Sequence, residues 1–242
     1  MKKVAIMQPY FFPYIGYWQL IYAADIFIIF DVVQFIWKGW INRNRVLKEN
    51  GGWKYITIPV KHSRREAKIY EVEIVDNLDV LDHVLRNLAF YYKVRKKVPY
   101  YDETISILKE ILSEARNTNK IAKINEIIIR KLCKILDCNT EINVASQMNF
   151  DYSNVKAPGD WAFEMTRQLG GDMYINPPGG RALFDKAKFR SANIELKFLV
   201  PNEIRYQQIG DKFEPWLSII DVLMFNGIEK TKKLLEEYRL ED

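Results

Sequence analysis

The chain has 242 residues, of which 48% are hydrophobic and 14% aromatic, and this is enough to bury a large core within one domain. The formal net charge of +5 suits an anionic substrate such as a nucleotide. The alternative is that this charge only keeps the protein soluble. Because the 36 basic residues are dispersed among 31 acidic ones, nucleic-acid binding is not expected.

The two cysteines and the N-terminal segment indicate a cytoplasmic protein. Cys133 and Cys138 lie in an apolar, helix-like run with no second cysteine pair and no histidine nearby, so neither a zinc site nor a disulfide framework is expected. The apolar run after Lys3 is broken at Gln8 and Pro9, which makes it too short for a signal peptide or a membrane span. We therefore expect no transmembrane segment and no metal site.

The first part of the chain has the pattern of a strand, a helix and a second strand. Residues 3–7 are β-prone, and this strand should end before Pro9, which has no N–H to donate. Residues 16–24 repeat apolar side chains at helical spacing. Residues 25–31 enclose a continuous apolar run, typical of a strand buried on both faces. This order predicts a βαβ unit and a parallel sheet.

Strand and helix patterns continue along the rest of the chain. Two strands, 42–47 and 53–60, flank an Asn50-Gly51 hairpin turn. The other expected strands are 69–75, 140–145, 173–175 and 195–200. The other expected helices are 79–92, 101–114, 119–136, 160–169, 182–191, 215–226 and 229–240.

These elements predict an α/β fold with a parallel or mixed central sheet and helices on both faces, of the Rossmann or nucleotidylyltransferase type. We expect a single domain over residues 1–242. Its α/β core would comprise 1–76 and 140–200, with a helical insertion at 79–136 and C-terminal helices at 215–240.

Polar side chains follow the predicted strands, at the edge where an open parallel sheet binds ligands. Gln8 follows the first strand, Asp31 and Gln34 follow the second, and His62 follows the strand 53–60. We expect Gln8, Asp31 and His62 to be catalytic, since the histidine pKa lies near working pH. The alternative for His62 is a surface histidine in a mobile basic loop. Gln34 is expected to contact the substrate.

Residues 8–17, here called the N-terminal elbow, connect the first strand to the first helix. Free N–H groups at the helix start could bind a phosphate, and we expect Tyr10, Tyr14, Gly16 and Tyr17 to contact the substrate. The geometry resembles the His-x-Gly-His elbow of the nucleotidylyltransferase superfamily, with tyrosines at the histidine positions. The side-chain pKa of tyrosine is about 10, so a tyrosine cannot take the role that an imidazolium has on a triphosphate. Adenylyl transfer by that motif is therefore not expected.

Residues 37–45 concentrate aromatic, cationic and amide side chains. The expected substrate contacts here are Trp37, Trp40, Asn42, Arg43, Asn44 and Arg45. Indole rings suit a sugar or base, and guanidinium groups suit a diphosphate or carboxylate. On a strand the two asparagines would face one side and the two arginines the other, so only one pair would face the ligand. A solvated basic loop with a tryptophan fixed to the core is the alternative.

Two later segments also contain candidate residues. In the loop 176–181, Asn176, Gly179 and Gly180 are expected to contact the substrate, because glycines let the backbone approach a ligand closely. A rigid turn is the alternative for this loop. Asp221 stands alone in the apolar run 217–227, so it must be paired or hydrogen-bonded. We expect it to be structural, for example as an anchor for an arginine of the cleft.

Five motifs are spread along the chain from the first strand to residue 227. They are Gln8-Pro-Tyr-Phe-Phe-Pro-Tyr-Ile-Gly-Tyr17, Asp31-Val-Val-Gln34, Trp40-Ile-Asn-Arg-Asn-Arg45, Asn176-Pro-Pro-Gly-Gly180 and Leu217-Ser-Ile-Ile-Asp-Val-Leu-Met-Phe-Asn-Gly227. Together they resemble the WbqC-like family. The resemblance implies a role in bacterial O-antigen or other surface-polysaccharide pathways, where nucleotide-linked amino sugars are built and decorated. Val32 stands where this family often has a second acidic residue, which weakens any mechanism that needs a carboxylate pair there.

Three functions fit these residues. The leading hypothesis is an amide-forming transferase that attaches an acyl or aminoacyl group to the amine of a nucleotide-linked amino sugar. The arginines of residues 37–45 would hold the diphosphate, the tryptophans would stack on the sugar or base, and His62 or Asp31 would accept the proton. The alternatives are an ATP-dependent ligase or nucleotidyl transferase, and a non-catalytic binding protein of a polysaccharide assembly. The expected partners are a nucleotide-linked sugar and an acyl donor, and the oligomeric state stays open.

Overall fold

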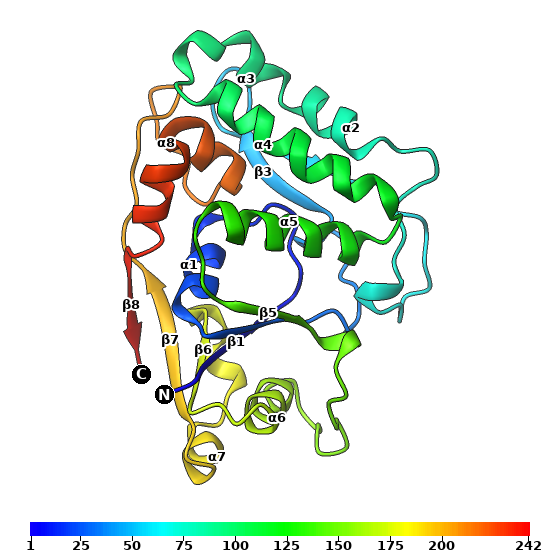
Figure 1. The fold of residues 1–242 in the computed structure, drawn as a ribbon, viewed down its shortest axis with the longest axis vertical. Helices are drawn as coiled ribbons and strands as arrows, with labels where there is room; N and C mark the ends of the chain where they lie inside the picture. The colour runs from blue at the N-terminus through cyan, green and yellow to red at the C-terminus, as the bar shows by residue number, and fades with distance from the viewer.

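A mixed sheet of six strands forms the centre of the computed structural model, which describes residues 1–242 (Figure 1). The strands are β1 (Lys3–Met7), β2 (Ile26–Ile29), β5 (Glu141–Val144), β6 (Met173–Asn176), β7 (Glu195–Pro201) and β8 (Tyr238–Glu241). Their order across the sheet is β5-β2-β1-β6-β7-β8, and only β8 runs antiparallel to its neighbour. The predicted α/β fold with a Rossmann-like sheet is confirmed.

Alternate residues of each central strand pack on opposite faces of the sheet. Ala5 belongs to the large hydrophobic cluster shared with α1 (Ile15–Ala23), α5 (Ile121–Ile135) and α8 (Ile219–Leu234). Its neighbours Val4 and Ile6 belong to a smaller cluster with α6 (Asp160–Gln168) and α7 (Lys186–Ser191). Both faces are therefore covered by helices, and this is why the strands read as continuous apolar runs.

The strand order changes direction between β1 and β6. From β1 the chain passes through α1 to β2 on one side, and it later returns through α6 to β6 on the other side of β1. In such sheets the loops after the two central strands diverge and leave a crevice at the carboxyl edge. Gln8 follows β1 and Pro177 follows β6, so both lie at this switch point.

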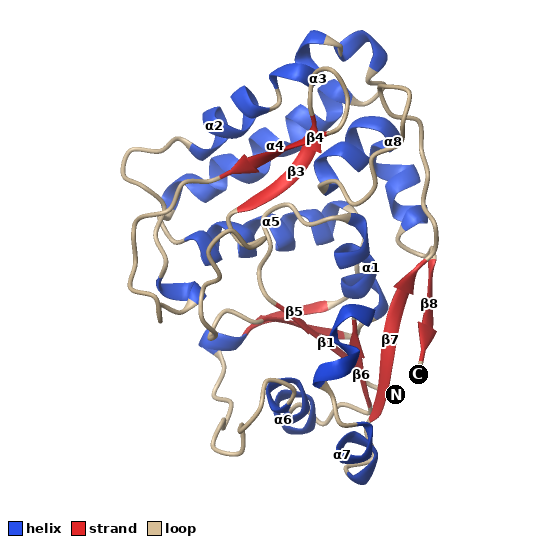
Figure 2. Ribbon diagram, turned by 180° about the vertical axis from the view of Figure 1, so that it is seen from behind, coloured by secondary structure: helices blue, strands red, loops and turns tan.

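The predicted hairpin forms, but it does not belong to the central sheet. Strands β3 (Arg43–Leu47) and β4 (Trp53–Thr57) make a separate antiparallel pair beside the helical middle of the chain (Figure 2). Asn50 and Gly51 have φ of 70° and 83°, the left-handed conformation that tight hairpin turns require. His62 follows β4 and therefore does not lie at a strand end of the central sheet. The expectation that placed it there is wrong.

Four helices form the middle of the chain: α2 (Val80–Asn87), α3 (Ala89–Lys93), α4 (Tyr101–Glu114) and α5. The helix predicted over 79–92 is split at Leu88, where φ and ψ leave the helical range. The strand predicted over 69–75 is wrong: Ile69–Glu71 is a 3₁₀ turn, because neighbouring loops accept its hydrogen bonds. Likewise, a 3₁₀ turn, Pro178–Leu183, precedes α7, so 182–191 is not one helix. None of the helices has the length and apolar composition that a bilayer-spanning segment needs.

The C-terminus differs most from the prediction. The predicted separation of two helical segments at Gly227 is confirmed, because α8 is interrupted there by a kink with φ of 65° and ψ of −175°. The last residues do not extend a helix, because Tyr238–Glu241 pairs with β7 as the edge strand β8. This pairing satisfies the open side of β7 and brings the two termini close together (Figure 1).

Candidate functional site

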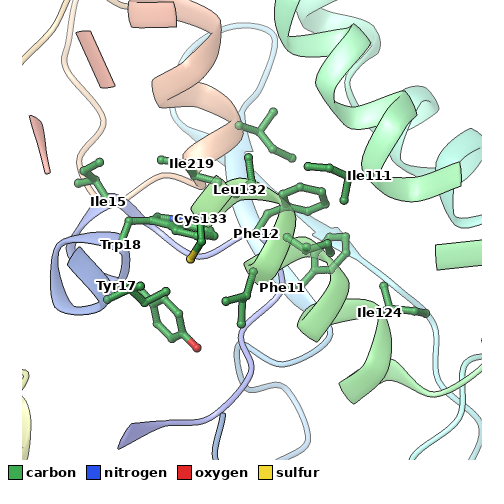
Figure 3. Close-up of a cluster of buried hydrophobic side chains, with 14 of the residues drawn as sticks. Phe11, Phe12, Ile15, Tyr17, Trp18, Ile111, Ile124, Leu132, Cys133 and Ile219 are labelled. Carbon is green, nitrogen blue, oxygen red and sulfur yellow. The ribbon is translucent and has the colours of Figure 1, made fainter. Parts of the chain in front are cut away.

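Phenylalanine side chains of the N-terminal elbow and a tryptophan of α1 are part of the hydrophobic core. Phe11, Phe12 and Trp18 are buried and point toward residues of α4, α5 and α8 (Figure 3). Rings of this size contribute much of the apolar area that a core buries. The conformation of the elbow is therefore fixed by packing, and these rings are closed off from solvent.

Side-chain amides fix the backbone of the elbow. The Nδ2 of Asn44 donates to the carbonyls of Phe11 and Phe12, at 3.0 Å each. The Nδ2 of Asn125 in α5 donates to the carbonyl of Pro9 at 2.8 Å and to that of Ile41 at 2.7 Å. Without these amides the carbonyls of Pro9, Phe11 and Ile41 would be buried without a donor, which is costly. The carbonyl of Phe12 also accepts from the hydroxyl of Ser218 at 2.7 Å.

The asparagines and arginines of the hairpin face opposite sides, as the strand pattern predicts. Asn44 is buried, and so is Asn42, whose Nδ2 donates to the carbonyl of Ile58 at 2.8 Å. Arg43 and Arg45 are half-exposed on the other side. The amide pair therefore holds the fold, and the guanidinium pair lies on the side that a ligand can reach.

The elbow tyrosines differ in accessibility. Tyr17 is buried, and its hydroxyl donates to the carbonyl of Gln8 at 2.9 Å. Burial raises the pKa of Tyr17 well above its usual value, so it stays neutral. Tyr10 packs on Tyr17 with a ring separation of 5.5 Å, while Tyr14 lies against Trp216 at 5.6 Å. Of the predicted elbow contacts, Tyr17 is sealed inside the protein, and Tyr14 is the one beside exposed aromatic surface.

The predicted catalytic residues Asp31 and His62 lie in different surroundings. The carboxylate of Asp31 accepts two hydrogen bonds from Ser146, which follows β5, and burial raises the Asp31 pKa. His62 is exposed on its loop, and its ring lies 6.0 Å from that of Trp37. Gln34 is exposed and donates to the carbonyl of Arg65 at 2.7 Å. The structure shows no contact among Gln34, Asp31 and His62.

Asn176 lies at the switch point but is already hydrogen-bonded. Its Oδ1 accepts from the hydroxyl of Tyr174 at 2.7 Å, and its Nδ2 donates to the carbonyl of Pro177 at 2.9 Å. A Cβ at position 180 would collide with this amide, so Gly180 leaves room for Asn176. Gly179 has open space around it. Asn176 and Gly180 thus contribute to the turn itself, and Gly179 is the accessible point of this loop.

An arginine–tryptophan surface covers the outer face of the hairpin. It consists of Trp40, Arg43, Arg45, Trp53, Tyr55 and Trp216. The Arg45 guanidinium carbon lies 5.4 Å from the ring centre of Trp40 and 5.1 Å from that of Trp53. These distances are in the range of cation–π contacts, which preorganise the guanidinium group. Large exposed indole rings are uncommon on protein surfaces and often mark binding sites.

Arg43 is less available than Arg45 because its guanidinium group is already bound. Its Nε donates to the carbonyl of Gly39 at 3.1 Å, and its Nη2 bonds the carbonyl of Lys38. These bonds close the turn that carries Trp37 and Trp40. Arg45 has one such bond, from Nη2 to the carbonyl of Trp216 at 3.0 Å. Arg45 therefore joins the hairpin to the segment 202–217, which the sequence reasoning did not select.

That segment encloses a cavity, here called the 202–217 pocket, with a volume of about 580 Å³. The pocket opens at the carboxyl end of β7, next to the first turn of α1. Its lining residues are Ile15, Pro201, Asn202, Glu203, Ile204, Arg205, Tyr206, Asp211, Lys212, Phe213, Pro215, Trp216, Leu217 and Val222. This volume falls in the usual range for small-molecule sites.

The pocket has an apolar base and a charged rim. Ile15, Leu217 and Val222 are buried, while Arg205 and Lys212 are exposed. Arg205 pairs with Glu203 at 2.6 Å, whereas Lys212 and the nearby Asp211 form no ion pair. Such a cavity can hold an amphipathic ligand with an anionic part. The pocket follows the last predicted parallel strand, 195–200, so the polar residues after that strand are its signal in the sequence.

The comparisons with known proteins agree with the motif analysis. A family model described as the WbqC-like protein family matches residues 8–233. The chain belongs to the WbqC-like protein family. The matched region of this WbqC-like protein begins at the elbow and ends in α8, so it includes the hairpin and the pocket.

A second comparison found a full-length relative. An uncharacterized protein of Mycobacterium tuberculosis, Rv1507c, is 29% identical to this WbqC-like chain over 230 residues, which is 95% of this chain and 96% of that protein. No solved structure shows significant similarity to the chain. The family predicted from the five motifs is therefore confirmed, and the chemistry has to be inferred from the site.

Proposed function

We propose that this WbqC-like protein is an amide-forming transferase that attaches an acyl or aminoacyl group to the amine of a nucleotide-linked amino sugar, in bacterial surface-polysaccharide synthesis. The observation that supports this best is the 202–217 pocket with its apolar base, its charged rim and the adjoining arginine–tryptophan surface. A nucleotide-linked amino sugar has complementary parts, namely a planar base, a diphosphate and an ammonium group. Indole rings, cations and carboxylates recognise these three parts respectively.

Each part of the site has a role in this proposal. Arg205 and Lys212 would bind the diphosphate, and the exposed ring of Trp216 would stack on the base or sugar. Asp211 would attract the ammonium group and accept its proton. The amine lone pair then attacks the acyl carbon of an activated donor, and a C–N bond forms. The bond from that carbon to the leaving group breaks, and the leaving group departs with the bonding electrons and takes up the second proton of the nitrogen. Holding amine and donor together supplies much of the rate.

The test is the mass of the sugar product. Purified protein is incubated with nucleotide-linked amino sugars and with acyl thioesters, or with amino acids, in the presence and absence of ATP. We expect the mass of one sugar to rise by that of the acyl group, and Lys212→Ala to lower kcat/KM about tenfold or more. Lys230→Ala is the matched control, because Lys230 is exposed on α8 and does not line the pocket. No mass increase on any sugar would reject the proposal.

A second candidate is an ATP-dependent ligase or nucleotidyl transferase, and the sheet topology favours it. The order β5-β2-β1-β6-β7 has the switch point at which many nucleotide-binding folds bind their ligand. Gln8 follows β1 and Asn176 is the last residue of β6, and these two strands flank the switch point. Release of pyrophosphate or ADP during product formation would favour this function, whereas acyl transfer without ATP would exclude it.

A further inference from the structure

A buried carboxylate without a cation lies directly behind the 202–217 pocket. Asp221 in the first turn of α8 is fully buried, and its neighbour Val222 lines the pocket. Its Oδ1 accepts a hydrogen bond from the hydroxyl of Tyr91 at 2.5 Å. Its Oδ2 accepts from the hydroxyl of Tyr206 at 2.7 Å and from Nε2 of Gln208 at 2.9 Å. The sequence led us to expect an arginine partner, and this is wrong, because three neutral donors solvate the charge.

Gln208 connects this carboxylate to the part of the pocket wall that has no regular secondary structure. Its Oε1 accepts from the backbone N–H of Glu214 at 2.8 Å, and its Nε2 donates to the carbonyl of Glu214 at 3.1 Å. The two bonds close a loop over residues 209–213. This loop carries three residues that line the pocket, Asp211, Lys212 and Phe213. One side-chain amide therefore sets the position of Lys212.

Tyr206 forms the second connection. Its hydroxyl donates to Asp221, while its ring lines the pocket and packs edge-on against Phe213, with ring centres 5.3 Å apart. The same ring lies 6.3 Å from that of Phe225 on α8. Both ends of the wall, Tyr206 and the loop 209–213, are thus held through the carboxylate of Asp221.

We propose that Asp221 is a positioning residue of this site: its ionised carboxylate orders Tyr206 and, through Gln208, the loop that holds Lys212 over the pocket. The nature of the ligand rests on the function proposed above, but the ordering of the wall does not. Tyr91, Tyr206 and Gln208 all donate hydrogen bonds to the carboxylate oxygens of Asp221. A proton bound to one of these oxygens competes with these donors. Protonation of Asp221 therefore frees Gln208 and loosens the loop.

The titratable groups that face Asp221 are Tyr91 from α3 and Tyr206 from the pocket wall. Burial and the nearby carboxylate raise the pKa of both tyrosines well above the usual value, so both remain protonated donors. Burial raises the pKa of Asp221 to about 6, against the opposing effect of its three hydrogen bonds. The ordering of the wall should accordingly change over a pH range near neutrality.

Hydrogen exchange of the full-length protein without ligand tests this inference. In the wild type we expect the protection of amides 206–214 to fall between about pH 7.5 and about pH 5. In Asp221→Asn we expect protection about tenfold lower than in the wild type at the higher pH, and no further change at the lower one. Thr231→Val is the matched control, because Thr231 is buried on the same helix and donates only to the carbonyl of Gly227.

A second variant covers the case in which Asp221→Asn fails to fold. Gln208→Ala removes the link between Asp221 and the loop but leaves the carboxylate with both tyrosine hydroxyls. We expect lower protection in 209–214 and unchanged protection in α8. Unchanged protection of the loop in both variants, or an equal loss in Thr231→Val, would overturn the inference. Because no ligand is present, these outcomes do not depend on whether the transferase assay succeeds.

Discussion

Asp31 accepts two hydrogen bonds from Ser146, at 2.9 Å from its backbone N–H and at 2.5 Å from its hydroxyl. The two residues follow β2 and β5, which are neighbours in the sheet, so the contact joins two strand ends. Asp31 is only 2% exposed, and desolvation raises its pKa. Its position at the carboxyl edge agrees with the sequence-based hypothesis, but both carboxylate oxygens are used in this contact.

This contact gives the first prediction, that Asp31 stabilises the fold through Ser146. Ser146→Ala removes the hydroxyl and should lower the free energy of unfolding by about 1–3 kcal/mol, because a buried carboxylate oxygen loses its donor. Urea unfolding measures the loss, and Ser106→Ala on the exposed side of α4 should cause none. Asp31→Asn should retain both the fold and transferase activity. An inactive but stably folded Asp31→Asn protein would instead support the catalytic role expected from the sequence.

The second prediction concerns the amide of Asn44 and the N-terminal elbow. Asn44→Ala leaves the buried carbonyl of Phe11 without its donor, while the carbonyl of Phe12 still accepts from the hydroxyl of Ser218 at 2.7 Å. The unfolding free energy should fall by about 1–3 kcal/mol, since the one unsatisfied carbonyl carries a desolvation penalty. Urea unfolding is the measurement, with Asn149→Ala at an exposed loop position as the control. A loss no larger than that of the control would mean that the elbow is held by ring packing alone.

Gly227 gives the third prediction, because its backbone conformation is open only to glycine. It has φ of 65° and ψ of −175°, and a Cβ there would lie 2.6 Å from the ring of Tyr100. Gly227→Ala should lower the unfolding free energy by at least about 1–3 kcal/mol from backbone strain alone. Gly179→Ala is the control, since open space surrounds that position. Equal thermal stability of the two variants would contradict this account of the kink in α8.

Individual helices and strands could be predicted from the sequence wherever the apolar residues followed a single pattern, either helical spacing or a continuous buried run. The run after Asp25 is apolar at every position because β2 is buried on both faces, and α4 was predicted with the bounds that it has. The edge strand β8 could not be found in this way. Residues 229–240 do repeat at helical spacing, and only the unpaired side of β7 makes their end a strand.

The candidate site was harder to predict because its contacts join distant parts of the chain. The sides faced by Asn44 and Arg45 followed from strand alternation, but the sequence does not show that Asn44 binds the elbow or that Arg45 reaches Trp216. The hairpin also separates from the central sheet, so its strand end gave no information about the site. Residues after β7, such as Arg205, would have been found by the same reasoning that selected Gln8.

The fourth prediction concerns ligand binding at the arginine–tryptophan surface. Trp53 and Trp216 are 37% and 52% exposed, so a stacked base should quench their fluorescence. Titration with UDP, chosen as the probe, should quench the wild type, and Trp53→Ala or Arg45→Ala should weaken binding about tenfold. Tyr92→Ala, which removes an exposed ring of α3 outside the arginine–tryptophan surface, should bind as the wild type does. Equal affinities in all four proteins would place the nucleotide elsewhere.

The last prediction is the pH dependence of global stability that Asp221 causes. Burial raises the pKa of its carboxyl from 3.8 to about 6, so the folded protein binds this proton more tightly than the unfolded chain does. The stabilisation is therefore complete below pH 3.8, is lost as the pH rises through about 6, and stays absent above it. Its size is on the order of 2–3 kcal/mol.

Residue 221 cannot titrate in Asp221→Asn. The unfolding free energy of the wild type relative to this variant should therefore fall as the pH rises from 3.8 to about 6, and it should stay constant above that pH. Urea unfolding at a series of pH values measures the difference, and Asp211→Asn is the control because its exposed carboxylate makes no ion pair. A wild type that gains stability relative to Asp221→Asn as the pH rises would show that the three hydrogen bonds outweigh desolvation. In that case the carboxylate would stay ionised under acidic conditions, and the ordering of the pocket wall would not respond to pH.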